Sequence, residues 1–259
     1  MKTTDLELSY PGFFVAEKIG KAVILRFAGN FFHNCIDFDK KNFFSEYLKM
    51  VGNAEDISAV ILHSAYSETG ENEYLKFFLR ERSHMSLSHF GFSDFMGANE
   101  LNRYCNFLDQ FVLDLIRINK FIIHICSGDV LTQVMNILLA CDHRIVGGDT
   151  VFHNIFQYVG TMPKGGSIYF MEKLLGHAKT MQLLLLQPRI SAAEALEYGL
   201  VDRVVAPDDI EKEAMAVVDA IQKIPGRTVA GMKRLTRLSL KDFETYLDKE
   251  TAEITRRGN

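Results

Sequence analysis

The stretch that decides the fold runs from Leu138 to Val205 and holds three linked pieces. It opens with LLACDHRIVGGDTVF (138–152), continues to GTMPKGG (160–166) and ends with LLGHAKTMQLLLLQPRISAAEALEYGLVDRVV (174–205). In the last piece, Ser191 and Glu194 have the spacing of a capping box, in which each side chain bonds the other residue's backbone N–H at the start of a helix. Gly199 supplies the left-handed residue that ends this helix.

Strand and helix patterns alternate on both sides of this stretch. Short apolar or β-branched runs indicate strands, and apolar residues at helical spacing indicate helices. Repeated alternation of this kind predicts an α/β protein with largely parallel strand pairing. In chain order we expect a hairpin at Phe13–Glu17 and Ala22–Phe27, a helix at Asp37–Val51, a strand at Ile57–His63, a helix at Leu101–Ile118, a strand at Phe121–Cys126, a helix at Leu131–Ala140 and a strand at Arg144–Val146.

Length, composition and charge narrow the class of protein. A chain of 259 residues with 47% hydrophobic content can bury a large core, as one domain or as a core with an appendage. The net charge of −4, without a Lys/Arg block, gives no electrostatic footprint for nucleic acid or an anionic membrane. No apolar run follows Lys2, and no window approaches the roughly 20 apolar residues of a membrane span. We therefore expect a soluble cytoplasmic protein with neither nucleic acid nor membrane as a partner.

The four cysteines are widely scattered and form no C-x-x-C pair. This spacing favours reduced thiols in an intracellular compartment over a disulfide framework or a zinc site. His84 and His89 lie five residues apart without an accompanying Cys/His set, so no metal site is expected. The cysteines are Cys35, Cys105, Cys126 and Cys141.

The pieces between Leu138 and Val205 resemble the crotonase (enoyl-CoA hydratase/isomerase) superfamily, because they occur in that family's order at close to its spacing. The resemblance covers nearly the whole chain and is weaker before Phe121. It implies a crotonase-like spiral of ββα units over residues 1–190, closed by a C-terminal region of consecutive helices over residues 191–259. It also implies a homotrimer or hexamer assembled through that region. The last helix carries an apolar stripe expected to pack on the core and at a trimer contact: Phe243, Tyr246, Leu247 and Ile254.

The resemblance also implies how a ligand is held. Members of the family bind an acyl thioester so that two backbone N–H groups meet its carbonyl oxygen. In the family's register, Glu73 supplies the first N–H and Gln133 the second, although Thr132, Gln133 and Val134 stand where the family keeps three glycines. Lys76 matches the lysine that often approaches the nucleotide part of coenzyme A. The implied partner is a small-molecule acyl thioester, with coenzyme A as part of the substrate and no separate cofactor.

The two glutamates that hydratases of this family use fall on Asn136 and Phe156. Asn136 can hold a water or a carbonyl but cannot abstract a proton, and Phe156 can do neither. Hydration by two glutamates is therefore not expected, and isomerisation through the second carboxylate is disfavoured. We take Asn136 and His153 as candidate catalytic residues, since an imidazole at a strand end can serve as acid or base near neutral pH. Further candidates are Asn154, Tyr158, Asp129 and His124, the last being interpreted as a satisfied core histidine.

Two classes of function stay open. The first is a lyase, isomerase or hydrolase that acts on a coenzyme A or carrier-bound thioester, or on a related β-dicarbonyl, through a backbone oxyanion hole. The second is a non-catalytic protein that keeps the fold for binding or assembly. The enzyme is favoured because Lys76, the turn at Pro163 and the helix after Ser191 persist around the expected cleft.

Overall fold

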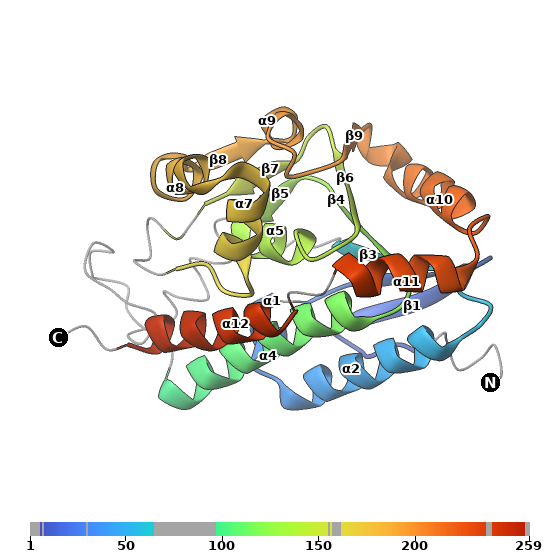
Figure 1. Ribbon diagram of the computed structural model, residues 1–259, viewed down its shortest axis with the longest axis horizontal. Helices are drawn as coiled ribbons and strands as arrows, with labels where there is room; N and C mark the ends of the chain where they lie inside the picture. Colours follow the sequence, from blue (N-terminus) through green and yellow to red (C-terminus); the bar gives the residue numbers. More distant parts are fainter. Residues whose placement is uncertain are drawn as a thin grey trace.

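Two sheets organise the fold, and helices pack around them (Figure 1). The computed structural model describes residue 6 and residues 8–29, 31–64, 97–154, 156, 162–236 and 240–256. The larger sheet has the strand order β1-β2-β3-β4-β6-β9, and the smaller has the order β5-β7-β8. The strands are β1 Phe14–Ile19, β2 Ala22–Phe27, β3 Ala59–Ser64, β4 Phe121–Cys126, β5 Asp129–Leu131, β6 His143–Gly147, β7 Val151–His153, β8 Arg189–Ser191 and β9 Arg203–Val205.

Parallel pairing dominates the larger sheet. The β1–β2 hairpin is antiparallel, and the later described pairs β2–β3, β3–β4, β4–β6 and β6–β9 are all parallel. In this register Leu25 lies opposite Leu62, and Leu62 lies opposite His124. Because side chains alternate between the two faces of a sheet, Leu62, Ser64 and His124 share one face.

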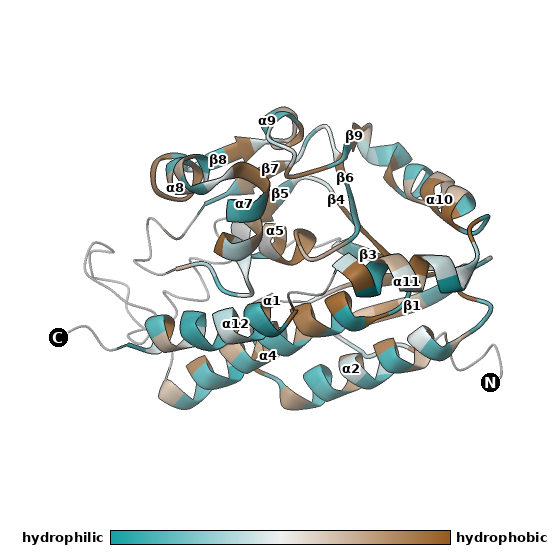
Figure 2. Ribbon diagram, in the orientation of Figure 1, coloured by the Kyte–Doolittle hydropathy of each residue, from teal (hydrophilic) through white to brown (hydrophobic). Residues whose placement is uncertain are grey.

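Helices bury both faces of this sheet. On one face, Val60 and Leu62 belong to a core that also takes in side chains of α2 and α4. On the other face, Ile61 and Ile123 pack with Ile210 and other residues of α10. Hydrophobic and hydrophilic residues alternate along α10 and α12, as expected of helices that cover a core (Figure 2). The helices are α1 Phe31–Cys35, α2 Phe38–Asn53, α4 Ala98–Arg117, α5 Thr132–Leu138, α7 Ser167–Leu175, α8 His177–Leu186, α9 Ala192–Glu197, η4 Pro207–Asp209, α10 Ile210–Ile221, α11 Gly226–Thr236 and α12 Leu240–Thr255.

The strand and helix predictions before residue 150 are confirmed within a few residues at each end. The capping box is confirmed as well: the Ser191 side chain accepts from the Glu194 N–H at 3.3 Å, and the Glu194 carboxylate accepts from the Ser191 N–H at 2.8 Å. Gly199 has a φ of 71°, as its place at the helix end requires. All four cysteines are buried and free of disulfide bonds.

The prediction of consecutive helices after residue 190 missed one strand. Strand β9 follows α9 and pairs with β6, so that the chain returns to the larger sheet before α10 begins. A strand of three residues is too short to show the alternation that identifies a strand in sequence, which explains the error. The division of the chain at residue 190 stays a prediction.

The apolar stripe of α12 packs on its own chain. Phe243 and Leu247 are buried against Val112 of α4, and the Phe243 ring lies 5.0 Å from the Phe170 ring of α7. The expected packing on the core is thereby confirmed, whereas a trimer contact through this helix stays a prediction. Within the described part of the chain, a helix with the length and hydropathy of a membrane span is not found.

Candidate functional site

Gln133 lies in the first turn of α5, where backbone N–H groups have no acceptor within the helix. Its side chain is buried and engaged elsewhere. The Nε2 group donates to the Lys164 carbonyl at 2.7 Å, and the Lys164 N–H donates to Gln133 Oε1 at 3.5 Å. The amide therefore holds the turn that precedes α7, and the backbone N–H is the group of Gln133 that remains for the predicted oxyanion role.

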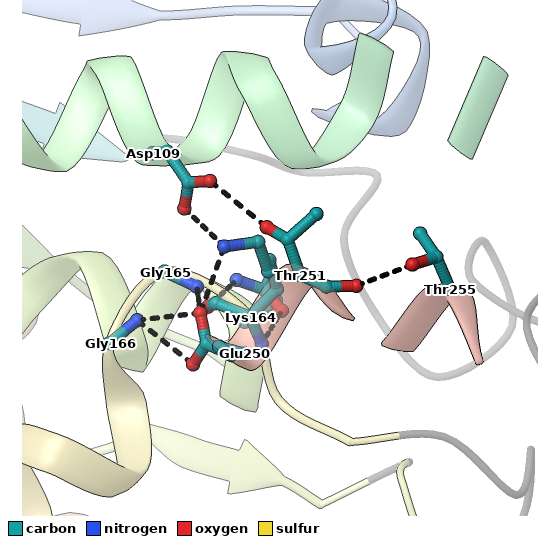
Figure 3. Close-up of polar contacts among 8 residues, drawn as sticks. Asp109, Lys164, Gly165, Gly166, Glu250, Thr251 and Thr255 are labelled. Atoms are coloured by element: carbon teal, nitrogen blue, oxygen red, sulfur yellow. Dashed lines mark hydrogen bonds and ion pairs between the residues drawn. The ribbon is translucent and has the colours of Figure 1, made fainter. Parts of the chain in front are cut away.

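A buried ion network fixes the same turn (Figure 3). The Lys164 ammonium donates to Glu250 Oε2 of α12 at 2.9 Å and also to Asp109 of α4. Glu250 accepts in addition from the N–H groups of Gly165 and Gly166, at 2.9 and 3.2 Å. The side chains of Lys164 and Glu250 are only 1% and 4% exposed. The network thus joins α4, α12 and the turn that bonds Gln133.

Burial and attraction act in opposite directions on the pKa values of this network. Burial raises the pKa of Glu250 and of Asp109 above the usual carboxyl range, and the Lys164 charge opposes the rise. Burial alone would lower the pKa of Lys164, but the charges of Glu250 and Asp109 outweigh it and raise that pKa. Lys164 is therefore an ammonium group at neutral pH. It has no free electron pair for use as a base or nucleophile.

His153, the second candidate catalytic residue, ends strand β7. Its Nε2 lies 2.6 Å from Asp129 Oδ1 on the neighbouring strand β5. The histidine side chain is 9% exposed and that of Asp129 is 66% exposed. A carboxylate bound to one ring nitrogen fixes the orientation of an imidazole, as it does for catalytic histidines. The structure therefore joins two of the sequence candidates, His153 and Asp129, at the strand that leads into α5.

The remaining candidates divide into three groups. Asn136 is in α5, one turn after Gln133, and its side chain is outside the described part of the structure, as are Glu73, Lys76 and Tyr158. Their proposed roles stay predictions. Phe156 is a buried apolar residue, so its position holds no proton-transfer group. The Asn154 amide donates to the carbonyls of Leu183 and Leu184 at 3.1 and 2.9 Å, which is a structural role at the end of α8.

The structure corrects the interpretation of His124. This residue lies in the core, but among the described residues only one of its ring nitrogens has a partner: Nε2 is 2.8 Å from Ser64 Oγ, whereas Nδ1 is buried without one. Burial lowers the pKa of His124 to about 3. The sequence carried a signal for this pair, since Ser64 and His124 are the polar residues at core-facing positions of two apolar strands. The signal was missed because it requires the register between those strands.

Comparisons with known sequences place similar proteins in one family. The family model described as Enoyl-CoA hydratase/isomerase matches residues 97–254. A trans-2-decenoyl-[acyl-carrier-protein] isomerase of Streptococcus mutans is 26% identical over 154 residues, which are 59% of this chain and 59% of that protein. Enoyl-CoA delta isomerase 2 of Rattus norvegicus is 26% identical over 149 residues, or 58% of this chain and 38% of the relative. The chain therefore spans 38–59% of these two relatives.

Solved structures confirm the predicted fold. An enoyl-CoA hydratase from Bacillus halodurans superimposes with a TM-score of 0.78, with 20% sequence identity and 94% of each chain covered. DspI of Pseudomonas aeruginosa superimposes with a TM-score of 0.71, with 17% identity and 95% of each chain covered. At this level of identity the likeness shows the fold, which is the crotonase-like spiral that the sequence predicts.

The ion network predicts a large effect of Glu250→Ala on stability. The substitution leaves the buried Lys164 charge with a single carboxylate, and breaking a buried pair costs about 3–5 kcal/mol. Glu253→Ala is the matched control on α12, because Glu253 forms an exposed pair with Arg256 at 3.4 Å and such pairs contribute about 0–1 kcal/mol. Urea unfolding measures both variants. Equal, small losses of unfolding free energy would show that Glu250 does not hold α12.

The low pKa of His124 predicts a stability that falls in acid. Between the unfolded pKa of about 6.5 and the folded pKa of about 3, the unfolded state binds one more proton, so stability is lost as the pH falls. From pH 7 to pH 5 the expected contribution of His124 is a loss of about 2 kcal/mol. His124→Gln cannot titrate and should lack this part of the loss in urea unfolding. An unchanged pH dependence in the variant would mean that His124 is not held neutral.

Proposed function

The chain belongs to the enoyl-CoA hydratase/isomerase family, and from this premise we propose that it binds an acyl thioester of coenzyme A or of an acyl carrier. The observation that carries the proposal is the hydrogen bonding of the Gln133 side chain. Its side chain replaces a glycine hydrogen of the family, yet that side chain is taken up by the turn at Lys164. The first turn of α5 therefore keeps a backbone N–H for a thioester oxygen.

The proposed chemistry is stabilisation of an enolate by backbone donors. A thioester whose α-carbon gains or loses a proton develops negative charge on its oxygen, and one N–H at that position contributes about 3–4 kcal/mol. Gln133 supplies one donor in this proposal and Glu73 the other, while Lys76 attracts the nucleotide part of coenzyme A. The names of the two relatives, which refer to acyl-carrier-protein and enoyl-CoA isomerases, support a thioester as the substrate class.

The proposed reaction is that of a lyase, isomerase or hydrolase, because the groups for two-glutamate hydration are missing. Phe156 is buried and apolar, and the Asn136 amide does not take up a proton. His153 is the proposed acid or base, oriented by Asp129 at 2.6 Å. Asn136 is proposed to hold a carbonyl or a water.

The alternative proposal is a non-catalytic member of the family that binds a ligand or assembles with other copies. It is favoured by one observation, which concerns the deeply buried side chains of Lys164 and Glu250. They form an ion pair that links the turn before α7 to α12, so their charges serve the structure and not catalysis. In either case we propose a homotrimer or hexamer in the cytoplasm. Exposed apolar side chains that such an assembly would cover are Leu185 and Leu186 of α8 and Met232 and Leu235 of α11.

Thioester binding at α5 predicts that the affinity for an acyl-CoA depends on the backbone N–H of Gln133. Gln133→Pro removes the N–H, and proline is tolerated in the first turn of a helix, so acetyl-CoA affinity should fall by about 2–10-fold, the value of one hydrogen bond to a neutral carbonyl. Gln133→Ala is the matched control, since it loses the Lys164 bond but keeps the N–H. Calorimetry measures both. Absence of binding of any acyl-CoA to the wild type at millimolar ligand would remove this proposal and favour the non-catalytic alternative.

Hydration of crotonyl-CoA should be negligible. Neither Asn136 nor Phe156 transfers a proton, so the two positions that activate the attacking water in hydratases of the family hold no carboxylate. Loss of absorbance by the conjugated thioester measures the reaction directly. A turnover within about tenfold of an ordinary enzyme, on the order of 10 per second, would show that other groups perform the proton transfers.

A further inference from the structure

A cavity of about 170 Å³ lies where β3 and β4 begin, at the end of the larger sheet away from the candidate thioester site. It is lined by the last turn of α2, the turn by which α10 enters α11 (Figure 1), and the residues just before the two strands, Ser58 and Lys120. Because β4 is six residues long, about 20 Å of sheet separates this cavity from the end of β4 that leads to α5. A single water needs only about 10–15 Å³, so the cavity has room for an organic molecule.

Two cationic side chains line this cavity, Lys120 and Arg227, and none of the described residues in its wall carries a carboxyl group. The Lys120 ammonium is half-buried, and it donates to the carbonyl of Ala54 at the end of α2 at 2.5 Å. An ammonium has three N–H donors, and within the described ranges this one bonds no second acceptor. Arg227 is exposed at the start of α11 and forms no ion pair with any other described residue. Both cations are therefore available to a ligand.

The nearest carboxylates do not neutralise Lys120. Burial lowers the pKa of Lys120, and the charges of Asp56 and Glu55 oppose this shift only in part. Asp56 is paired with Lys18 at 2.5 Å, and Glu55 is exposed to solvent. A cation that is taken out of water without an opposite charge beside it is destabilised. An anion in the cavity would supply that charge.

The other side of the cavity is apolar. Ile221 ends α10, Ile224 lies in the turn that follows, and Val229 belongs to α11; all three line the cavity. The Ile224 side chain is 41% exposed, so part of this apolar wall faces solvent. Removing apolar surface from water is favourable. A ligand that covers this wall and carries a negative charge would satisfy both sides of the cavity.

The two sides of the cavity are fixed relative to each other. Lys233 of α11 is buried, and its ammonium donates to the Lys120 carbonyl at 2.7 Å and pairs with Asp142. The Asp142 carboxylate also accepts from the Ile122 N–H of β4 at 2.8 Å. These bonds tie α11 to the start of β4. A ligand that enters a preformed cavity loses little affinity to the ordering of the protein.

We propose that this cavity binds an organic anion with a short apolar body. The anionic head lies between Lys120 and Arg227, and the body packs on Ile221, Ile224 and Val229. A guanidinium can bond a carboxylate or a phosphate with two N–H groups, so either head fits the chemistry of the site. The site is separate from the candidate thioester site and does not rest on the proposed function.

Calorimetry on the whole chain separates the contribution of the head from that of the body. Hexanoate and hexyl phosphate carry both parts, 1-hexanol carries only the body, and inorganic phosphate carries only a head. Because two weak contacts reinforce each other when one molecule makes both, the tighter of the two hexyl anions should bind about tenfold or more better than hexanol or phosphate. That anion also identifies the head. Absence of binding of both hexyl anions at millimolar concentration, or binding of phosphate or hexanol with equal affinity, would overturn the proposal.

Single substitutions then place the anion in this cavity. Arg227→Gln removes an exposed charge and should weaken binding about two- to fivefold, and Lys120→Gln removes a half-buried one and should weaken it about tenfold. Lys49→Gln is the matched control, because Lys49 is an exposed cation that lines the neighbouring cavity between α2 and α4 but not this one. Should Lys120→Gln fail to fold, Ala230→Phe fills the cavity from α11 and should abolish binding. Unchanged affinity in Arg227→Gln together with either of these variants would overturn the site.

Hexanoate bound in the candidate thioester site gives a different result. It would compete with acetyl-CoA, and its affinity would not respond to Arg227→Gln. The proposal predicts the reverse: saturating acetyl-CoA leaves the affinity for the hexyl anion unchanged, and Arg227→Gln lowers it. If acetyl-CoA does not bind at all, the proposed function fails, and the response to Arg227→Gln still supports or overturns this second site.

Discussion

The buried ion pair between Lys164 and Glu250 holds together the parts of the chain on which the candidate site depends. Glu250 belongs to α12, Lys164 belongs to the turn before α7, and Asp109 adds α4 to the same network (Figure 3). The Lys164 carbonyl also accepts from Gln133 Nε2 at 2.7 Å. The C-terminal helix is thereby linked through one residue to the first turn of α5. Because a buried charge is unstable without its partner, the docking of α12 and the shape of this turn depend on each other.

The pairing of these buried charges limits which groups of the candidate site are available for chemistry. The Lys164 ammonium pairs with the carboxylates of both Glu250 and Asp109, and this use of the three side chains joins helices. Among the described residues beside α5 are backbone N–H groups and the His153–Asp129 pair. A site of this composition suits a thioester, whose oxygen needs hydrogen-bond donors more than it needs charged side chains.

Local sequence patterns predicted most of the helices and strands, whereas they could not predict the contacts between them. The capping box at Ser191 and the strand at Phe121–Cys126 were predictable because their signals lie within a few residues. Lys164 and Glu250 are 86 residues apart and look in sequence like solvated charges, so their pairing required the fold. The need of His124 for a partner was hidden for the same reason, since it follows from the β3–β4 register. The roles of Glu73 and Lys76 rest on family spacing alone.

The most direct test of the account is a crystal structure with an acyl-CoA analogue in which a methylene group replaces the thioester sulfur and the carbonyl is retained. We expect the carbonyl oxygen within about 3 Å of the Gln133 backbone nitrogen, while the Gln133 side chain stays bonded to the turn at Lys164. An analogue bound elsewhere on the molecule, or a Gln133 side chain displaced into the cleft in place of the ligand, would contradict it.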